Sequence, residues 1–315
     1  MRNLPSESIS FRPFQSGDLE PIVSLWNACL HKDPITSERF WRLFLLDPNF
    51  RAEGALVAEF DGRPVGFLQA MVQRPPVGST TNSPVPGWIT AFFVATEFRC
   101  LGIGSHLMDL GLEFLRSYQC ESVSINGYAP NYAFPGVDVD YVEATSFLEA
   151  RGFKRIAEPV AMALLFDDWK GSVHVALDIT VRPVELQDTL PLLAFAEKQF
   201  PHWRECILDG LQVCASNVFV ALQGDEVIGF AQWENPQTDP PTGATGRFGP
   251  FGVHPELRGQ GLGTVIFGKV IEHLKSRGVD SLWFGWAGGR NLSFYERAGC
   301  KVTRRYQMFW KGVGC

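Results

Sequence analysis

The sequence predicts two α/β domains in tandem, each with a sheet flanked by helices. Three observations support this: the chain length, an order of elements that occurs twice, and two matching glycine-bearing turns. At 315 residues the chain is long enough for two domains that each bury a core. Hydrophobic residues make up 45% and charged residues 20%, which is typical of globular domains and argues against a disordered chain.

Each half begins with the same pattern of a strand followed by a helix. Residues 9–13 are followed by Asp18 in the first half, and residues 179–183 are followed by Asp188 in the second. Proline closes each strand because it lacks the N–H that a sheet needs. The aspartate is placed to cap the helix that follows.

A hairpin, a strand, a turn and an amphipathic helix come next in each half. The hairpins turn at Asp61-Gly62 and at Gly224-Asp225, both strong hairpin signals between apolar strands. In the first half the strand is at 88–94, the turn at 99–104, and the helix runs to about 118. In the second half the strand is at 248–253, the turn at 258–263, and the helix runs to about 277. We therefore predict a duplicated domain, with one copy at 1–168 and the other at 174–315.

The composition narrows the possible functions. The seven cysteines are scattered and form no C-x-x-C pair, which favours reduced thiols in the cytoplasm and predicts neither a disulfide framework nor a metal site. The net charge is −6 and the basic residues are dispersed, so we expect no nucleic-acid partner. Because no apolar stretch reaches roughly 18 residues, no membrane helix is predicted. The first ten residues are mostly polar, which argues against a secretory signal peptide.

The chemistry lies in two turns with the pattern Arg-x-x-Gly-x-Gly, at 99–104 and 258–263. Each follows a strand and precedes a helix, so successive backbone N–H groups and the helix dipole converge on one small volume. Glycine lets an anion approach the backbone without a Cβ in the way. The turns therefore predict a pyrophosphate site.

Competing phosphate motifs fail on spacing. A dinucleotide fingerprint requires a third glycine, but Leu107 and Thr264 stand at those positions, and neither turn supplies the lysine of a nucleotide P-loop. A plain helix-entry turn remains the alternative for one copy alone. Two copies in matching context favour the anion site.

The string at 253–263 resembles the acetyl-CoA signature of the GNAT N-acetyltransferase superfamily, and 291–299 is similar to that family's second motif. The resemblance covers nearly the whole chain, once per half, and the second copy is the closer match. It implies two tandem GNAT-type domains, each with a mixed, mostly antiparallel sheet that is splayed between its fourth and fifth strands. It also implies direct transfer of an acetyl group from acetyl-CoA, as co-substrate, to an amine.

The resemblance assigns roles to individual residues. Tyr295 matches the tyrosine that protonates the departing thiolate, a general-acid role; its alternative is a packing residue on a helix. Backbone amides hold the pyrophosphate, the fourth strand faces the pantetheine amides, and an asparagine contacts the cofactor arm. The residues so assigned are Phe251, Gly252, Val253, Leu257, Arg258, Gly259, Gln260, Gly261, Leu262, Gly263 and Asn291, with Arg99, Gly102 and Gly104 in the first copy.

The first copy departs from the family pattern. Leu148 stands at the position of Tyr295, and Ala144 at that of Asn291. The N-terminal domain is therefore expected either to bind CoA without catalysis or to be structural. Its longer segment at 126–138, followed by Asp140, is either a packed loop or a lid over a site.

The general base is not fixed by the sequence. Strands 248–253 and 282–286 carry no carboxylate, so Glu234 is the nearest candidate, while His254 precedes Pro255 in a stretch that serves a turn. Four aromatic residues either line an acceptor pocket or belong to the core: Trp233, Trp283, Phe284 and Trp286.

The sequence predicts an acetyl-CoA-dependent N-acetyltransferase with its main site in the C-terminal domain. The expected acceptor is a small-molecule or peptide amine, and the protein is expected to be a monomer or homodimer. Two alternatives stay open: a CoA-binding module without turnover, and a transferase of a longer acyl group.

Overall fold

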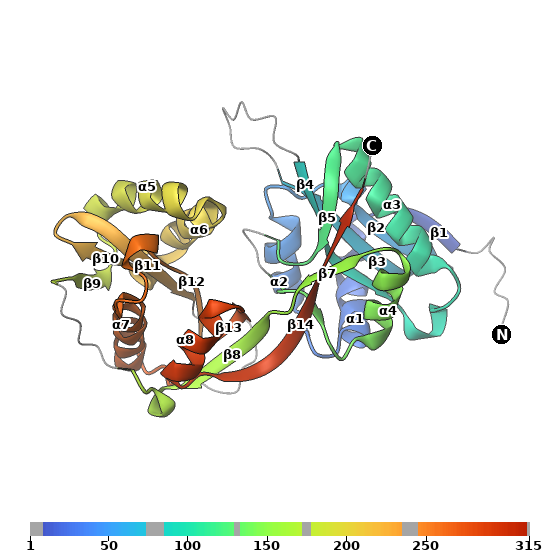
Figure 1. Cartoon of the computed structure of the whole chain (residues 1–315). Coiled ribbons are helices and arrows are strands. Elements are labelled where there is room, and N and C mark those ends of the chain that lie inside the picture. The colour runs from blue at the N-terminus through green and yellow to red at the C-terminus, as the bar shows by residue number, and fades with distance from the viewer. Residues whose placement is uncertain (1–8, 74–84, 129–132, 172–177, 235–244, 314–315) are drawn as a thin grey trace. The chain divides into compact units, whose positions relative to one another are not determined.

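The computed structural model describes residues 9–73, 85–128, 133–171, 178–234 and 245–313. The chain divides into two compact units, which Figure 1 shows as ribbons. Unit 1 consists of Met1–Ala157 and Tyr306–Cys315, and unit 2 consists of Glu158–Arg305. Each unit is a mixed, mostly antiparallel sheet with helices packed against it, which confirms the predicted fold class.

The sheet of unit 1 has the order β1-β2-β3-β4-β5-β14-β7. Only β4 and β5 are parallel neighbours, and every other pair in it is antiparallel. The elements are β1 Ile9–Pro13, α1 Leu19–Cys29, α2 Ser37–Phe40, β2 Ala55–Phe60, β3 Arg63–Val72, β4 Val85–Val94, α3 Ile103–Ser117, β5 Cys120–Ile125, β6 Val137–Asp138, α4 Val142–Ala150, β7 Lys154–Ala157 and the later part of β14 Lys301–Gly312.

The sheet of unit 2 repeats this plan with the order β9-β10-β11-β12-β13-β8-β14. Here β12 and β13 are the parallel pair. The elements are β8 Val160–Leu165, β9 Thr180–Pro183, α5 Thr189–Gln199, α6 Arg204–Cys214, β10 Val218–Gln223, β11 Glu226–Glu234, β12 Thr245–Val253, α7 Leu262–Ser276, β13 Ser281–Ala287, α8 Arg290–Ala298 and the first part of β14.

Helices cover both faces of each sheet because strand side chains alternate between faces. In β3, Phe67 belongs to the cluster of buried side chains under α1, while its neighbour Leu68 belongs to the cluster under α3. In β11, Phe230 packs with the residues of α5 and Ala231 with those of α7. Each unit therefore has two apolar layers, one on either side of its sheet.

The two sequence halves exchange their last strands. β8 belongs to the first half of the sequence but lies in unit 2, where it pairs with β13 and with Lys301–Arg305. The later part of β14 lies in unit 1, where it pairs with β5 and β7. The two compact units are therefore not divided at a single point of the chain. The domain boundaries at 168 and 174 concern the duplicated sequence and stay a prediction. Residues 172–177 lie outside the described residues.

Asp18 and Asp188 stand at the N-cap positions of α1 and α5, as expected, but their side chains make no capping hydrogen bond to the helix, so that part of the expectation was wrong. The Asp18 carboxylate instead accepts hydrogen bonds from two nitrogens of Arg12, at 2.7 and 2.8 Å, and from the backbone N–H of Gln15. Arg182 makes the same pair of bonds to Asp188 at 2.5 and 3.1 Å. Each carboxylate therefore ties the first strand of its unit to the turn before the helix.

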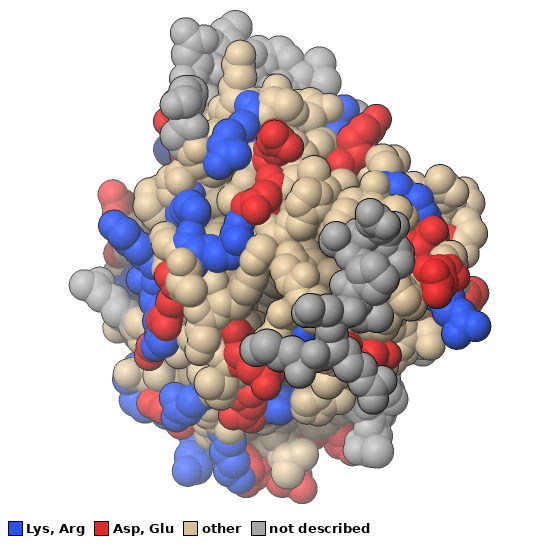
Figure 2. Space-filling model, turned by 90° about the vertical axis from the view of Figure 1, so that its right-hand side faces the viewer, with Lys and Arg blue, Asp and Glu red and all other residues tan. Residues whose placement is uncertain are grey.

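The molecular surface carries mixed charges. On the face drawn in Figure 2, Lys and Arg side chains alternate with Asp and Glu side chains. None of the helices in the described part of the chain has the length and apolarity that crossing a bilayer requires.

Candidate functional site

In each unit the two parallel strands pair only at their first residues and then separate. β4 pairs with β5 over Val85–Ile89, and β12 pairs with β13 over Thr245–Arg247. Beyond Ile89 and Arg247, no strand among the described residues pairs with that edge of β4 or β12. Each unit therefore contains the predicted gap, at which an extended ligand can meet unpaired backbone N–H and C=O groups.

A β-bulge lies where each gap begins. β4 carries one extra residue, Thr90, between its pairings of Ile89 and Ala91 with β3. In β12 the extra residue falls within the pair Gly249 and Pro250. A bulge withdraws backbone groups from the sheet ladder, but proline has no N–H to offer a ligand. The gap of unit 1 therefore begins with a possible backbone donor at Thr90, whereas Pro250 of unit 2 has none.

The two glycine-bearing turns have the same backbone conformation. The second and fourth positions have positive φ in both: 60° at Cys100 and 85° at Gly102, against 82° at Gly259 and 87° at Gly261. The 15-residue helices α3 and α7 begin at the next residue. Their first N–H groups lack helical partners and lie at the positive end of the helix dipole. Both turns therefore present the arrangement that binds a phosphate anion.

The arginine that opens each turn holds the turn against the end of the preceding strand. Arg99 Nε donates to the carbonyl oxygen of Val94 at 3.1 Å, and Arg258 Nε donates to that of Val253 at 3.4 Å. This gives both arginines a structural role. Contact of their side chains with a cofactor stays a prediction.

An aromatic pair joins the fourth strand of each unit to its short last helix. Phe92 of β4 stacks on Phe147 of α4 with 5.3 Å between ring centroids, and Phe251 of β12 lies 6.0 Å from Phe294 of α8. A Cβ on Gly104 would lie 3.2 Å from the Phe92 ring. The last glycine of the turn therefore leaves room for the ring that holds the helix beside the gap.

Tyr295 lies on α8 and is 7% exposed. Its ring centroid is 4.2 Å from that of Phe284 on β13 and 5.8 Å from that of Phe267 on α7. Burial strongly raises the pKa of the Tyr295 hydroxyl, and the nearby Cys300 thiol adds to this. The phenol is therefore fully protonated near neutral pH, as a proton donor must be.

The other predicted cofactor residues of unit 2 lie on β12, on the turn into α7 and on α8. Phe251, Gly252 and Val253 form the end of β12. Asn291 is exposed in the first turn of α8, directly after the two-residue link from β13. The remaining residues follow one another along the turn into α7: Leu257, Arg258, Gly259, Gln260, Gly261, Leu262 and Gly263.

The two candidate bases already have partners. Glu234 is exposed at the end of β11, and its carboxylate lies 3.1 Å from Arg247 Nη1 on β12. His254 Nδ1 accepts the N–H of Glu256 at 3.3 Å, and its Nε2 lies 3.3 Å from Gln199 Nε2. The hydrogen bond from the Glu256 N–H indicates that His254 helps to hold the turn. The identity of a general base is still open.

Comparison with known proteins identifies the family. The acetyltransferase (GNAT) family matches residues 19–134 and again residues 182–300. The chain belongs to this family. A curated relative, the uncharacterized N-acetyltransferase YjhQ of Escherichia coli K12, is 28% identical over 94 residues, or 30% of this chain and 51% of the relative. This chain thus matches about half the length of that relative.

Solved structures share the tandem fold. One is a fungal glucosamine N-acetyltransferase region of a multi-domain GH3 β-N-acetylglucosaminidase, with a TM-score of 0.82 and 21% identity over 96% of this chain and 38% of that chain. Another is a GCN5-related N-acetyltransferase from Sphaerobacter thermophilus, with a TM-score of 0.72 and 19% identity over 99% and 98%. A tandem GNAT protein from the clavulanic acid biosynthesis pathway has a TM-score of 0.66 and 16% identity over 98% and 99%. These likenesses show the fold.

The four aromatic residues proposed for an acceptor pocket divide into two groups. Trp233 and Phe284 are buried in the core of the second GNAT unit. Trp283 is half-buried and faces the Arg247 guanidinium, with 5.9 Å from its carbon to the ring centroid, and Trp286 is 41% exposed. Only Trp283 and Trp286 are therefore accessible to a ligand.

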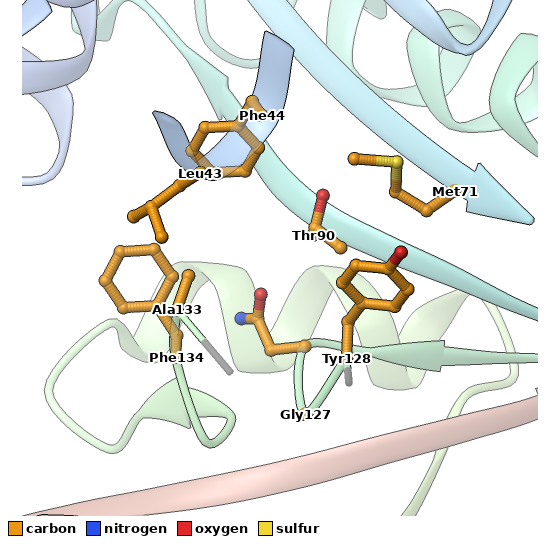
Figure 3. Close-up of a pocket in the computed structure, with 9 residues that line it drawn as sticks. Leu43, Phe44, Met71, Thr90, Gly127, Tyr128, Ala133 and Phe134 are labelled. Carbon is orange, nitrogen blue, oxygen red and sulfur yellow. The ribbon is translucent and has the colours of Figure 1, made fainter. Parts of the chain in front are cut away.

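The first GNAT unit contains two cavities that the sequence did not predict. Figure 3 shows the smaller, of about 10 Å³, with Phe44 and Phe134 on one side, Met71 on the other and Thr90 between them. The larger, of about 80 Å³, shares Thr90, Asn126 and Phe134 with it. Both cavities therefore adjoin the bulge where the gap of unit 1 begins.

A buried carboxylate supports the wall of the smaller cavity. The Tyr128 hydroxyl donates to Asp47 Oδ1 at 2.9 Å and accepts from Asn49 Nδ2 at 2.6 Å. Burial raises the pKa of the Asp47 carboxyl, although the hydrogen bonds from Asn49 and Tyr128 oppose this. The network fixes the start of the segment after β5, of which residues 129–132 lie outside the described residues.

This region could be predicted only in part from the sequence. The length of the segment at 126–138 and the acidic residues Asp138 and Asp140 stood out in the pattern, but Asp33 and Tyr141 did not. Asp33, Asp138 and Tyr141 all line the larger cavity. Because Asp33 lies far along the chain from Asp138 and Tyr141, only the folded chain brings the three together.

Proposed function

We propose that this GNAT protein transfers an acetyl group from acetyl-CoA directly to a primary amine, and that its main transfer site lies in the C-terminal domain at 174–315. The observation that carries the proposal is the conjunction of three features within unit 2: the phosphate turn, the gap beside β12, and Tyr295 on the helix next to that gap.

The turn accounts for cofactor binding. Glycines at both positive-φ positions, Gly259 and Gly261, let the backbone approach a pyrophosphate without a Cβ. In unit 1 the first of these positions is Cys100. A non-glycine residue at this φ is uncommon and carries its side chain close to the phosphates. This difference favours unit 2 as the tighter CoA site.

Tyr295 accounts for departure of the thiol. As the amine nitrogen forms its bond to the acetyl carbonyl carbon, the carbon–sulfur bond breaks and the sulfur needs a proton. The protonated phenol of Tyr295 is proposed to supply it, and the second proton that the nitrogen loses as the acetamide forms restores the phenol. Before attack, the ammonium group of the substrate must lose a proton. Glu234, which is ion-paired to Arg247, is proposed to accept this proton through a water molecule.

Two features support the alternative of a CoA-binding module without turnover. Pro250 provides no N–H at the bulge of β12. Neither β12 nor β13 carries a carboxylate. Transfer of a longer acyl group is a further alternative, because the proposed cofactor residues would bind the CoA part and would not set the length of the acyl chain.

The acceptor is proposed to be a small-molecule or peptide amine. An amino sugar belongs in the first panel, because a fungal protein of similar fold is described as a glucosamine N-acetyltransferase. A cytoplasmic location and a monomeric or homodimeric state stay predictions from the sequence.

Thiol release from acetyl-CoA tests the proposal. The full chain is assayed with glucosamine, a polyamine, an amino acid and a peptide amine, and with propionyl-CoA in place of acetyl-CoA. Amine-dependent release of CoA with formation of the acetamide is expected for at least one acceptor. CoA binding without amine-dependent release by any acceptor would support the module; faster release from propionyl-CoA would support the longer acyl group.

A further inference from the structure

The helix that carries Tyr295 is short and has few buried side chains of its own. α8 has nine residues, and isolated helices shorter than roughly 12 residues are barely stable in water. Among residues 291–298 only Tyr295 and Ala298 are buried. No hydrogen bond of the Tyr295 hydroxyl occurs among the described residues. The position of the phenol therefore depends on how α8 is held against the rest of unit 2.

Segment 166–171, the strap, contacts the C-terminal end of α8. The Lys170 N–H donates to the carbonyl oxygen of Ala298 at 3.1 Å, one of the carbonyls that the last turn of a helix leaves without a helical partner. Asp168 Oδ2 lies 2.6 Å from Lys301 Nζ, at the start of β14. The strap is therefore attached both to the helix and to the strand that follows it.

The strap also contributes an aromatic ring to the core beneath α8. Trp169 packs against the cluster of buried side chains that contains Tyr295. Its ring centroid lies 5.3 Å from that of Phe267, which in turn lies 5.8 Å from that of Tyr295. A Cβ on Gly171 would overlap the Trp169 ring, so glycine at this position leaves room for the ring. Phe267 therefore links the ring of the strap to the ring of Tyr295.

The matching helix of unit 1 has no such cover among the described residues. Gly152 lies just after α4 and Gly299 just after α8, with φ of 81° and 102°. A Cβ on Gly299 would overlap the backbone carbonyl oxygen of Asp168, whereas a Cβ on Gly152 would have no other described atom within 4 Å. Unit 1 carries Leu148 where unit 2 carries Tyr295. The cover is therefore present in the unit that has the proposed proton donor.

We propose that the strap positions Tyr295 for acetyl transfer, and that Trp169 is the positioning residue. It acts through Phe267 and the end of α8, and the inference rests on the proposed role of Tyr295 as proton donor. A shift of about 1 Å in a reacting group can lower a rate about 10²-fold. A loosened α8 should therefore slow the chemical step and leave acetyl-CoA binding nearly unchanged. The linker between the two sequence repeats is then part of the transfer site of the second.

Hydrogen exchange in the full chain tests the hold of the strap on α8 without acetyl transfer. The amides of Gly299 and Cys300 close the last turn of the helix. Trp169→Ala should raise their exchange at least about tenfold, since local opening then loses a packed ring. Exchange in α5, on the other face of the sheet, should change little, and Trp169→Phe should stay near the parent. Parental exchange at Gly299 and Cys300 in Trp169→Ala would overturn the proposal.

Transfer kinetics test the effect on the reaction, with an acceptor found in the thiol-release panel. At saturating acetyl-CoA, Trp169→Ala should lower the single-turnover rate about tenfold, and acetyl-CoA affinity by calorimetry should stay within about twofold of the parent. Trp169→Phe should restore most of the rate. Trp310→Ala removes the same side chain from an exposed position of unit 1; it is the matched control and should leave the rate unchanged.

A double-mutant cycle separates positioning from a general loss of stability. If Trp169 acts through the Tyr295 hydroxyl, Trp169→Ala should lower the rate little further in a Tyr295→Phe background, because the hydroxyl is already absent. A variant that only reduced the amount of folded protein would lose the same factor in both backgrounds. Equal losses in the two backgrounds would therefore overturn the positioning role.

A second variant decides the question if Trp169→Ala fails to fold. Lys170→Pro removes the N–H that bonds to Ala298, and Trp169 already has the extended backbone that a following proline requires, with φ −59° and ψ 122°. Exchange at Gly299 should rise and the rate should fall about threefold, as loss of one hydrogen bond allows. Parental exchange and rate in folded Lys170→Pro would overturn the proposal.

Failure of the strap and failure of the proposed proton donor give different results. Raised exchange at Gly299 in Trp169→Ala, together with a parental rate in Tyr295→Phe, would overturn the acid role of Tyr295 and with it the catalytic meaning of the strap. Parental exchange in Trp169→Ala, together with a slow Tyr295→Phe variant, would overturn the strap alone.

Discussion

The two units share the backbone of a GNAT site but not its side chains. Both have the same positive-φ turn, the same parting of two parallel strands and the same aromatic pair beside the gap. Yet Leu148 replaces Tyr295, and a long segment at 126–141 replaces Gly288 and Gly289. The shared backbone features depend on glycine, strand pairing and packing, all of which the stability of the fold requires. The side chains that touch a ligand are free to differ.

This comparison suggests a division of roles. Unit 2 keeps Tyr295, the proposed proton donor, and glycine at both positive-φ positions of its turn, and unit 1 has the larger cavity. Variants in each unit can show how far the two units are independent, and which differences between them matter for binding and rate.

The largest effect is expected at Phe309, which is 0% exposed in the core of unit 1 although it comes after all of unit 2 in sequence. Phe309→Ala should destabilise unit 1 by about 3–5 kcal/mol, as loss of a buried aromatic ring does. Hydrogen exchange should rise in α3 and much less in α7. The control Trp310→Ala, at a side chain 37% exposed, should have a small effect. Equal loss of protection in α3 and α7 would show that the units unfold together.

A matched pair of glycine variants comes next. Gly102→Asp and Gly261→Asp introduce the same side chain at nearly the same φ, so their backbone strain should be alike. If unit 2 is the main acetyl-CoA site, Gly261→Asp should lower CoA affinity at least about tenfold by calorimetry, with a carboxylate among the phosphates. Gly102→Asp should cost much less activity. Similar losses of activity in both would point to two working sites.

Tyr295→Phe keeps the ring and its packing and removes only the hydroxyl. Turnover should fall about 10²-fold, the low end of what general-acid help provides, because thiols leave fairly well unaided. CoA affinity and thermal stability should stay close to those of the parent. Tyr295→Leu reproduces the residue of unit 1 and should reduce turnover at least as much. Parental turnover in Tyr295→Phe, under conditions where chemistry limits the rate, would remove Tyr295 from the mechanism.

The smallest effect is expected from acid. The hydrogen bond from Arg182 is the main cause that lowers the pKa of Asp188. A lowered folded-state pKa means that the carboxylate stabilises the protein above its unfolded pKa of about 3.9 and loses this as pH falls through the folded value. Asp188→Asn should therefore be less stable near pH 7, by about 1–2 kcal/mol for a charge-assisted pair, and should flatten the pH dependence below pH 4. An unchanged slope in chemical unfolding between pH 4 and pH 2 would contradict this.

The sequence predicted what depends on local pattern. Gly102 and Gly261 marked the turns because only a few residues tolerate positive φ, and apolar periodicity marked α3 and α7. The partner of a strand is not a local property. Nothing around Phe309 shows that it pairs with Ile125 and not with a strand nearer in sequence. This is why the duplicated halves were predicted but the exchange of β8 and β14 was not.

The candidate site was predicted in the same uneven way. Tyr295 and the turn follow from motifs, whereas the burial of Trp233 and Phe284 was one of two open alternatives. The larger cavity combines Asp33 with Asp138 and Tyr141, which lie on two distant segments. Such convergence is set by the sheet and its helices, so no spacing along the chain could reveal it.

The exchanged strands also set an order for synthesis. β5 emerges from the ribosome early, but the part of β14 that covers its edge, Phe309–Gly312, follows only after all of unit 2 has been translated. Until then the nascent first unit exposes an unpaired strand edge, which is prone to join with other chains. A fragment that ends at Ala157 would keep that edge permanently. Expression of either half by itself is therefore a poor route to either GNAT site.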